Sequence, residues 1–529
     1  MKPLFRWGLV LLLAVAGSLP LRAATLRHAS AFDPQTMDPH SLALLYHTRV
    51  ITQIYESLVN RGKDFKTLEP SLAVSWQMVE PTVWRFKLRP NVKFHDGTPF
   101  SADDVVFSIQ RALEKTSQRA NQLAGLTGAR KVDALTVDLV TSAPDAVLPE
   151  KLWPVGMMSK AWAEQHGVTK PQDYNGKQET YAVRNANGTG PFMLERYESD
   201  VRTVLKANPH WWGKGTPAGG GNLEEVHYLV IQSDATRLAA LQSGQVDFII
   251  DPPFQDLPRL KADPSIKISS IEDIGTQYLA FDQHSAELPG SGISGRNPFK
   301  DLRVRKAVQL AIDTDLIVRQ VLRGEGRATG SHMSPMIDGY VPAFEKRPKF
   351  DPAAARALLQ QAGYGSGFSV TLDCVNIAFR AAVCQAVASM LEKVGLKVKF
   401  QPSPTSTFFP KLTQGTGSFL EFGWSPNTDP WNILQALVHT HDGFAAGAFN
   451  AGRYSNAKLD ALIDGIRVEP DLAKRRRMVG EALAMMNAEL PLVPLYRRHH
   501  NWVMRPNVSL VQWPNDVLEL RWVKVSPTR

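Results

Sequence analysis

Two histidines and two cysteines are the residues of this sequence whose types and spacing most suggest chemistry. His439 and His441 are separated by one residue, and two imidazoles so placed could bind a metal ion or a metal complex. No third ligand is evident in the sequence, which favours a solvated loop. Cys374 and Cys384 could pair in an oxidising compartment or remain two buried thiols. A Cα separation beyond about 7 Å would exclude the bond.

A glycine-rich stretch at residues 290–295 (GSGISG) has the spacing of a dinucleotide-binding turn. Such a turn must join a strand directly to a helix, whereas here Arg296, Asn297 and Pro298 delay the next helix. We interpret the stretch as a flexible loop. The sequence also lacks the phosphate-loop, nucleophile-elbow and zinc-protease patterns. We therefore expect no enzyme, no catalytic residues, no cofactor and no metal centre.

The composition is that of a folded chain with a large core. It has 529 residues, of which 43% are hydrophobic and 21% charged. The two cysteines exclude a disulfide-rich scaffold. The formal net charge of +9 could indicate nucleic acid as a partner. Basic residues form tight clusters only at 474–477 and 497–500, however, so we expect solvated surfaces and no nucleic-acid partner.

The first residues are typical of a secretory signal peptide. Lys2 and Arg6 precede a charge-free stretch, residues 7–21, and small residues follow at Ala23 and Ala24. The stretch is shorter than the roughly 20 residues of a membrane span and contains a proline. We expect cleavage of residues 1–23, no lipid anchor because no cysteine is near, and export to the periplasm. Removing the signal leaves a net charge of +6.

Helix and strand signals alternate along the chain. Ser101 and Asp104 have capping-box spacing before an apolar helical pattern. Asp234 is expected to cap a helix that Gly244 ends, and Asp301 to open another. Residues 368–374 alternate as a strand, 383–394 follow helical spacing, and 396–400 alternate again. This strand–helix–strand order predicts a parallel pair and an α/β fold with more than one lobe.

Residues 86–105 (FKLRPNVKFHDGTPFSADDV) resemble the signature of the extracellular solute-binding proteins of family 5, the peptide/nickel group that feeds ATP-binding-cassette (ABC) importers. Further segments resemble the family in the same order: GTGPF at 188–192, NPHWWG at 208–213, LQSGQVD at 241–247, DLRVRKAV at 301–308, AID at 311–313, YSN at 454–456 and PLVPLY at 491–496. The resemblance covers the mature chain and identifies it as a member of the family.

The resemblance implies a bilobal clamshell of the type II periplasmic-binding-protein class, with mixed sheets flanked by helices. Lobe I, which carries an extra inserted subdomain, would span residues 24–273 and return at 494–529. Lobe II would span 274–493. The chain would thus cross the hinge twice, near 275–282 and near 495–502. Function would be closure over a solute that contacts both lobes.

The expected ligand contacts come from the same resemblance. In peptide-binding members, a Gly-Trp followed by an aspartate-containing loop pairs with the α-amine of the peptide. The matching segment here is GWSPNTDPW at 423–431, in which Asn427 or Pro426 replaces the amine-pairing aspartate and Asp429 matches a later, more structural one. A neutral residue there removes a charge-assisted pair, roughly 1.5–3 kcal/mol of preference for an ammonium group.

The remaining candidate contacts complete the predicted site. Arg380 could substitute for the arginine that binds a ligand carboxylate in dipeptide-type members. Trp424 would be an aromatic wall of the cleft, and Trp431 is either a second wall or a core residue. Phe32 and Met37 would line the lobe I side.

The predicted function is a periplasmic, monomeric substrate-binding component that delivers a peptide or peptide-like solute to ABC permease subunits in the inner membrane. The alternatives are a binder of a metal chelate or haem-like ligand through His441, and an exported enzyme on the same scaffold. The sequence does not name the solute.

Overall fold

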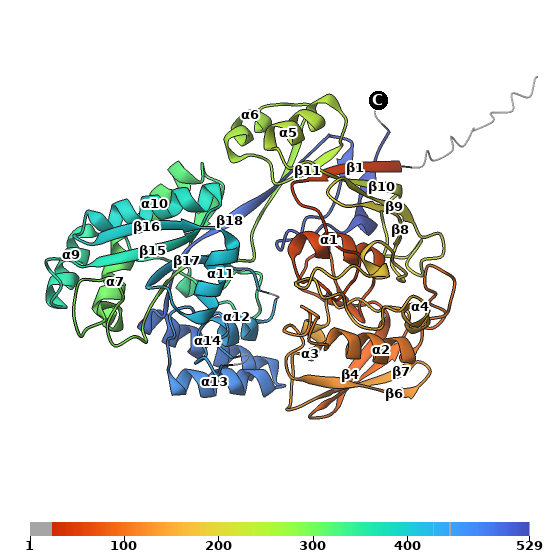
Figure 1. The fold of residues 1–529 in the computed structure, drawn as a ribbon, viewed down its shortest axis with the longest axis horizontal. Coiled ribbons are helices and arrows are strands. Elements are labelled where there is room, and N and C mark those ends of the chain that lie inside the picture. The colour runs from red at the N-terminus through yellow and green to blue at the C-terminus, as the bar shows by residue number, and fades with distance from the viewer. Residues whose placement is uncertain (1–23, 427, 444–445, 528–529) are drawn as a thin grey trace, which may run out of the picture.

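The computed structural model describes residues 24–426, 428–443 and 446–527. The predicted signal segment and Asn427 therefore lie outside the described residues. The described chain forms two α/β lobes that lie side by side and are joined at one end by the long strand β18 (Leu492–Met504), as Figure 1 shows. The predicted two-lobed α/β class is confirmed.

One sheet continues through both lobes because β18 belongs to each. The central strands follow the order β16-β15-β17-β13-β18-β11-β1-β10-β9-β8. The first half of β18 pairs with β13 (Thr276–Phe281) in lobe II, and its last residues pair with β11 (Phe248–Ile250) and β12 (Lys267–Glu272) in lobe I. All these pairings are antiparallel, so the chain enters lobe II along β12 and β13 and leaves it along β18.

Lobe I is built on β1, which runs parallel to both of its neighbours, β10 and β11. Side chains alternate between its faces: Leu26 packs in the core beneath α1, and Ala29 packs with Leu238 and Leu241 of α5. The elements are β1 (Ala24–Ser30), α1 (Leu45–Ile54), β8 (Phe192–Glu198), β9 (Arg202–Ala207), β10 (Leu223–Val230), α5 (Asp234–Ser243), α6 (Leu257–Lys261), β19 (Val508–Ser509) and β20 (Lys524–Val525).

An inserted subdomain, residues 59–165, extends below lobe I in Figure 1. Its four-stranded antiparallel sheet, in the order β4-β5-β7-β6, packs on α2. Phe86 and Leu139 of the sheet and Val105 and Ile109 of the helix share one core. The elements are β2 (Val59–Arg61), β3 (Leu68–Pro70), β4 (Ala73–Glu80), β5 (Val83–Leu88), α2 (Ala102–Ala112), β6 (Leu126–Asp133), β7 (Thr136–Thr141), α3 (Leu148–Lys151) and α4 (Lys160–Gln165).

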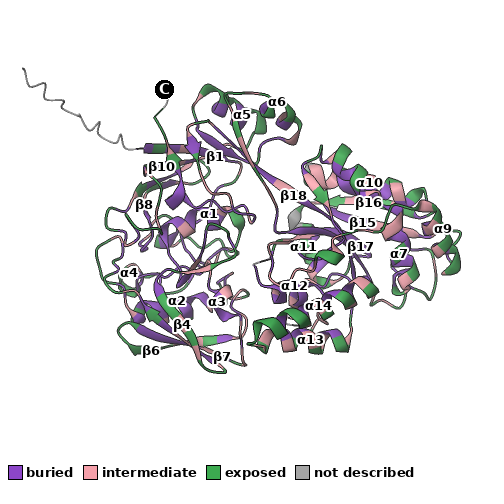
Figure 2. Ribbon diagram, turned by 180° about the vertical axis from the view of Figure 1, so that it is seen from behind, coloured by how far each residue is buried: buried purple, intermediate pink, exposed green. Residues whose placement is uncertain are grey.

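Lobe II has helices on both faces of its sheet, which explains why every residue of β13 is buried. Leu279 and Phe281 pack in a core with α7 and α10, whereas Tyr278 and Ala280 pack in a core with α12 to α14. Figure 2 shows the buried strands between these helical layers. The elements are α7 (Leu302–Ala311), α8 (Thr314–Leu316), β14 (Gly326–Ala328), α9 (Pro352–Gln361), β15 (Ser369–Val375), α10 (Ala378–Glu392), β16 (Lys397–Ser403), α11 (Thr405–Gln414), β17 (Phe419–Trp424), α12 (Pro430–Leu437), α13 (Ala457–Val468) and α14 (Leu472–Glu489).

The structure contains the helix caps and the strand–helix–strand unit that the sequence predicts, except that one cap lies one residue earlier. The capping box of Ser101 and Asp104 is present at the start of α2, Asp301 caps α7, and β15 and β16 pair in parallel around α10. The expectation that Asp234 caps α5 is wrong. Ser233 is the cap, because its hydroxyl accepts from the backbone N–H of Thr236, and Asp234 lies in the first turn.

Candidate functional site

Loops that follow parallel strands are where α/β proteins commonly place ligands. In lobe I, β1 and β11 are parallel, and Phe32 and Asp251 come directly after them. In lobe II, β15 and β17 are parallel, α10 follows β15, and Trp424 ends β17. The segments that follow β11 and β15 touch, since the rings of Phe254 and Phe379 are 5.7 Å apart. Residues from both lobes therefore border one region between them.

A groove of about 670 Å³ lies between the inserted subdomain and lobe II. Its walls come from both sides and include Lys66, Trp84 and Glu150 of the subdomain and Thr428, Asp429 and Arg475 of lobe II. Thr428 and Asp429 belong to the segment in which the sequence predicts ligand contacts.

Trp424 is half-buried at the end of β17. Its indole N–H donates to Oδ1 of Asn432 at 3.1 Å, and its ring lies 4.7 Å from that of Phe449. The next residue, Ser425, donates to Oδ1 of Asp273 at the crossing between the lobes. The tryptophan is thus held by neighbours in lobe II and keeps part of its surface exposed.

Asp429 is buried and fully engaged within lobe II. Its Oδ1 accepts from the backbone N–H of Trp431 at 2.8 Å, which caps α12. Nη1 of Arg475 lies 2.7 Å from Oδ2, and Nη2 of the same guanidinium donates to Oδ1. These contacts place Asp429 as the residue that fixes the start of α12 behind the Trp424 loop.

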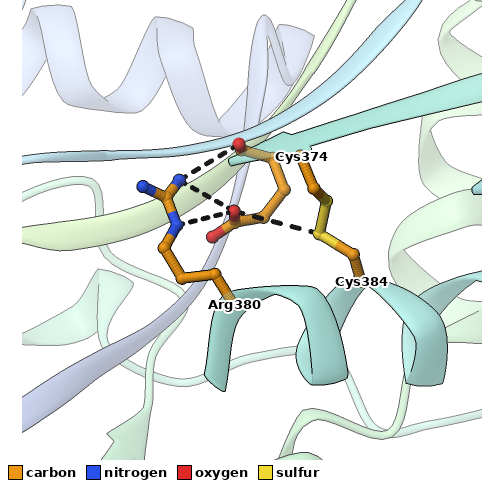
Figure 3. The surroundings of a disulfide bond; sticks show 4 residues. Cys374, Arg380 and Cys384 are labelled. Carbon is orange, nitrogen blue, oxygen red and sulfur yellow. Dashed lines mark hydrogen bonds and ion pairs between the residues drawn. A yellow bond between two sulfur atoms is a disulfide. The ribbon is translucent and has the colours of Figure 1, made fainter. Parts of the chain in front are cut away.

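Arg380 is paired inside the protein, as Figure 3 shows. Its Nε and Nη2 donate to Oε2 of Glu421 at 3.0 and 2.8 Å, and Nη2 also donates to the Glu421 carbonyl. Burial raises the pKa of the Glu421 carboxyl although Arg380 opposes the shift. The arginine that the sequence offers for a ligand carboxylate therefore already binds one.

Cys374 and Cys384 form a disulfide beside this ion pair (Figure 3). Their Cα atoms are 6.7 Å apart, below the separation of about 7 Å beyond which a disulfide cannot form. The sequence left open whether the two cysteines pair, and in the structure they do. The bond ties the end of β15 to the second turn of α10, the helix that carries Arg380.

Trp431 is 9% exposed and packs in a lobe II core, but one neighbour comes from the other lobe. Nζ of Lys151, in α3, lies 4.6 Å from the ring centroid, and Cζ of Arg467, in α13, lies 5.6 Å from it. Trp431 thus packs in the lobe II core at its boundary with the inserted subdomain, and its role as a wall of the cleft stays a prediction.

Phe32 and Met37 lie in the segment after β1 with very different exposure. Phe32 is 53% exposed and stacks on Tyr46 at 5.6 Å, whereas Met37 is 0% exposed in the lobe I core. Phe32 is thus accessible at the surface, whereas Met37, which the sequence expects to line the lobe I side, packs in the core instead.

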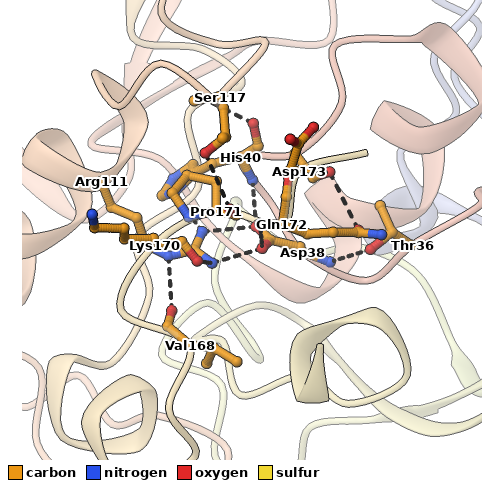
Figure 4. A network of polar contacts seen from close by, with 12 residues as sticks. Thr36, Asp38, His40, Arg111, Ser117, Val168, Lys170, Pro171, Gln172 and Asp173 are labelled. Carbon is orange, nitrogen blue, oxygen red and sulfur yellow. Dashed lines mark hydrogen bonds and ion pairs between the residues drawn. The ribbon is translucent and has the colours of Figure 1, made fainter. Parts of the chain in front are cut away.

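A buried polar network anchors the same segment to the inserted subdomain (Figure 4). Nη1 and Nη2 of Arg111, in α2, donate to the two carboxylate oxygens of Asp38 at 2.7 and 2.6 Å, and Nη1 also contacts Nδ1 of His40. Burial alone would raise the pKa of the Asp38 carboxyl, but the guanidinium overrides it and lowers the pKa to about 2. The pair fixes the loop that presents Phe32.

His441 is half-buried, and its Nδ1 contacts the Ala446 carbonyl at 3.3 Å. It is not part of any compact group of three or more potential metal ligands among the described residues. Among the residues that the structure describes, the one such group is Cys374, Cys384 and Glu421, and its two sulfurs are bonded to each other.

A charged cluster lies where the chain crosses between the lobes. Nε2 of His500, in β18, is 3.2 Å from Oδ1 of Asp273, and its Nδ1 is 3.7 Å from Asp516. Burial lowers the pKa of His500, but the two carboxylates outweigh it and the pKa is raised. Because Ser425 donates to the same Asp273, this cluster connects the Trp424 loop to the crossing.

The sequence reasoning missed Glu421 and Lys151. Glu421 is a single acid in the apolar strand 419–424, and a charge in such a strand requires a buried cation, which was a usable signal. Lys151 carries no comparable signal, since only the folded chain brings it to Trp431.

Comparison with known proteins places this architecture in a family. The model of the bacterial extracellular solute-binding proteins, family 5, matches residues 67–444. Among curated relatives, Heme-binding protein A of Haemophilus influenzae is 28% identical over 84% of this chain and 81% of its own. The periplasmic murein peptide-binding protein MppA of Escherichia coli is 26% identical over 90% of this chain and 88% of its own.

Solved structures agree on the fold. HbpA2 from Haemophilus parasuis has a TM-score of 0.78 at 25% identity and covers 95% of this chain and 100% of its own. The periplasmic binding protein DppA from Helicobacter pylori, in complex with the peptide STSA, also has a TM-score of 0.78, at 22% identity over 95% of this chain and 98% of its own. The chain belongs to the bacterial extracellular solute-binding proteins of family 5.

Proposed function

We propose that this protein captures a peptide or peptide-like solute between its two lobes and delivers it to the permease subunits of an ABC importer in the inner membrane. The observation that carries the proposal is that strand-end loops of both lobes border one region, as a solute must contact both lobes to favour closure. Curated relatives that bind murein peptide and dipeptides support the solute class.

The division of the chain follows the two crossings. We propose lobe I at 24–273 and 494–529 and lobe II at 274–493. Residues 1–23 would be removed as a signal, leaving a periplasmic monomer without a lipid anchor. No helix among the described residues is long and apolar enough to cross a membrane.

Within the site, Trp424, Asn427 and Phe32 are the proposed solute contacts. Trp424 is half-buried and Phe32 is exposed, and the two residues belong to opposite lobes. Arg380 and Asp429 are engaged in ion pairs, so we assign them to holding the loops in position. A solute that depends on a free carboxylate would have to compete with Glu421 for Arg380.

The direct test is mass spectrometry of the solute released from protein purified without unfolding, followed by titration calorimetry with the compound identified. A peptide or peptide-like compound that binds saturably, and that binds at least tenfold more weakly to the Trp424→Ala variant, supports the proposal. Release of a sugar or a lipid instead would contradict the solute class.

A haem-like ligand or metal chelate is the second candidate, favoured by the 28% identical haem-binding relative. Titration with hemin under absorbance detection tests it. Saturable binding with a Soret shift that His441→Ala abolishes would favour a haem-like ligand, and an unshifted spectrum would eliminate it.

A further inference from the structure

The inserted subdomain and lobe II are in direct contact at a point formed by Asp145, Lys151, Trp431 and Arg467. The Trp431 ring of lobe II lies against the Lys151 ammonium group of the subdomain. A cation over an indole face is attracted more strongly when it is desolvated, and both residues here are buried.

Asp145 forms two ion pairs, one of which crosses the boundary. Nζ of Lys151 is 2.7 Å from Oδ2 of Asp145, and Nη2 of Arg467, from lobe II, is 3.8 Å from the same oxygen. Asp145 thus lies between a cation of its own subdomain and a cation of lobe II. Its side chain is completely buried, so separating the lobes would remove one of its two cations.

Backbone and hydroxyl contacts reinforce this point. The backbone N–H of Ala146 donates to the Arg467 carbonyl at 3.1 Å, and the Thr428 hydroxyl donates to Oε2 of Glu150 at 3.0 Å. Nζ of Lys66 donates to the Pro335 carbonyl at 3.1 Å. None of these contacts requires a solute, because every partner belongs to the protein.

We propose that Trp431, Lys151, Asp145 and Arg467 form an interlobe latch, which stabilises the arrangement in which the subdomain and lobe II touch, here called the closed form, independently of the solute. The latch adds a fixed free energy to the closed state, and it therefore sets the balance between open and closed protein before any solute binds. This inference goes beyond the proposed function: Trp431 acts on the lobes, and the solute contacts belong to Trp424 and Phe32.

The test uses the full mature chain without solute, so that its result is independent of solute identity. Spin labels are introduced at two exposed positions, Gln77→Cys in the inserted subdomain and Glu481→Cys in lobe II. Pulsed electron paramagnetic resonance then reports the distance between the labels. The wild type should show a major short-distance population. Arg467→Met, which removes the interlobe cation, should shift the population to longer distances, whereas Arg467→Lys should retain most of it.

The matched control is Arg303→Met, in which the lost arginine is exposed in α7 and its ion-pair partner is the nearby Asp301. It should leave the distance distribution unchanged. Thermal melting confirms that each variant is folded, and Trp431→Phe serves as a second, mild probe of the ring. A distribution for Arg467→Met that superimposes on that of the wild type would overturn the latch.

Discussion

At the scale of single residues, the site is shaped by ion pairs in which both partners are side chains of the protein. Arg380 is the clearest case, because its guanidinium is already paired with the buried carboxylate of Glu421. Asp429 and Arg475 repeat the arrangement behind the next loop. The fine shape of the cleft thus depends on side chains that a solute never needs to touch.

Removing one partner of such a pair should be costly. Arg380→Met leaves the Glu421 carboxylate buried without a cation, and we expect a loss of about 3–5 kcal/mol in the free energy of unfolding. The double variant Arg380→Met/Glu421→Leu should recover most of that loss, since no charge is left uncompensated. Urea denaturation measures both.

An unchanged unfolding midpoint for Arg380→Met, together with a lost affinity for the solute, would contradict this structural role. It would return Arg380 to the direct ligand contact that the sequence first offered.

At the scale of elements, the cleft depends on how helices begin. Asp429→Ala removes the cap of α12 and also leaves Arg475 without its carboxylate. We expect a loss of about 3–5 kcal/mol. The control Asp351→Ala removes an exposed cap from α9 and should cost only about 1 kcal/mol. Equal shifts of the two midpoints in chemical denaturation would show that the Arg475 pair adds nothing.

The disulfide between β15 and α10 is a second element-scale feature. It closes a short loop, since its cysteines have a sequence separation of 10, so its loss should cost about 3 kcal/mol in the chain-entropy model. Thermal melting of the wild type with and without dithiothreitol measures the effect. The variant Cys374→Ala/Cys384→Ala is the control, because its melting temperature should not respond to the reductant.

Signals that act within a few residues were readable from the sequence, and those that join distant segments were not. The Ser101–Asp104 box and the β15–α10–β16 unit are local and were predicted. The cap of α5 was misplaced by one residue because Ser233 and Asp234 are both good caps. The Lys151–Trp431 contact joins residues 280 positions apart, and no spacing rule reports it.

At the scale of the whole molecule, buried neutral histidines make stability depend on pH. Burial lowers the pKa of His28, His40 and His47 to about 3 and that of His95 and His332 to about 4. Below pH 6.5, the ordinary pKa of histidine, these side chains bind protons in the unfolded chain but stay neutral in the folded protein. Each group should therefore remove up to about 1.4 kcal/mol of stability per pH unit below 6.5.

The measurement is the melting temperature between pH 7.5 and pH 4.5. It should fall steeply below pH 6.5, and His332→Gln should flatten the slope. His500 has a raised pKa and acts in the opposite sense: its contribution is present below 6.5 and is lost as the pH rises through its folded value. A melting temperature that stays constant down to pH 5 would contradict the assignment.

The position of β18 has a consequence for the newly made chain. The strand comes from residues 492–504, near the end of the sequence, yet it lies between β13 and β11 at the centre of the shared sheet. Neither lobe can complete its sheet until residues 492–504 have been synthesised. Both lobes therefore wait for the same late segment before their shared sheet can close.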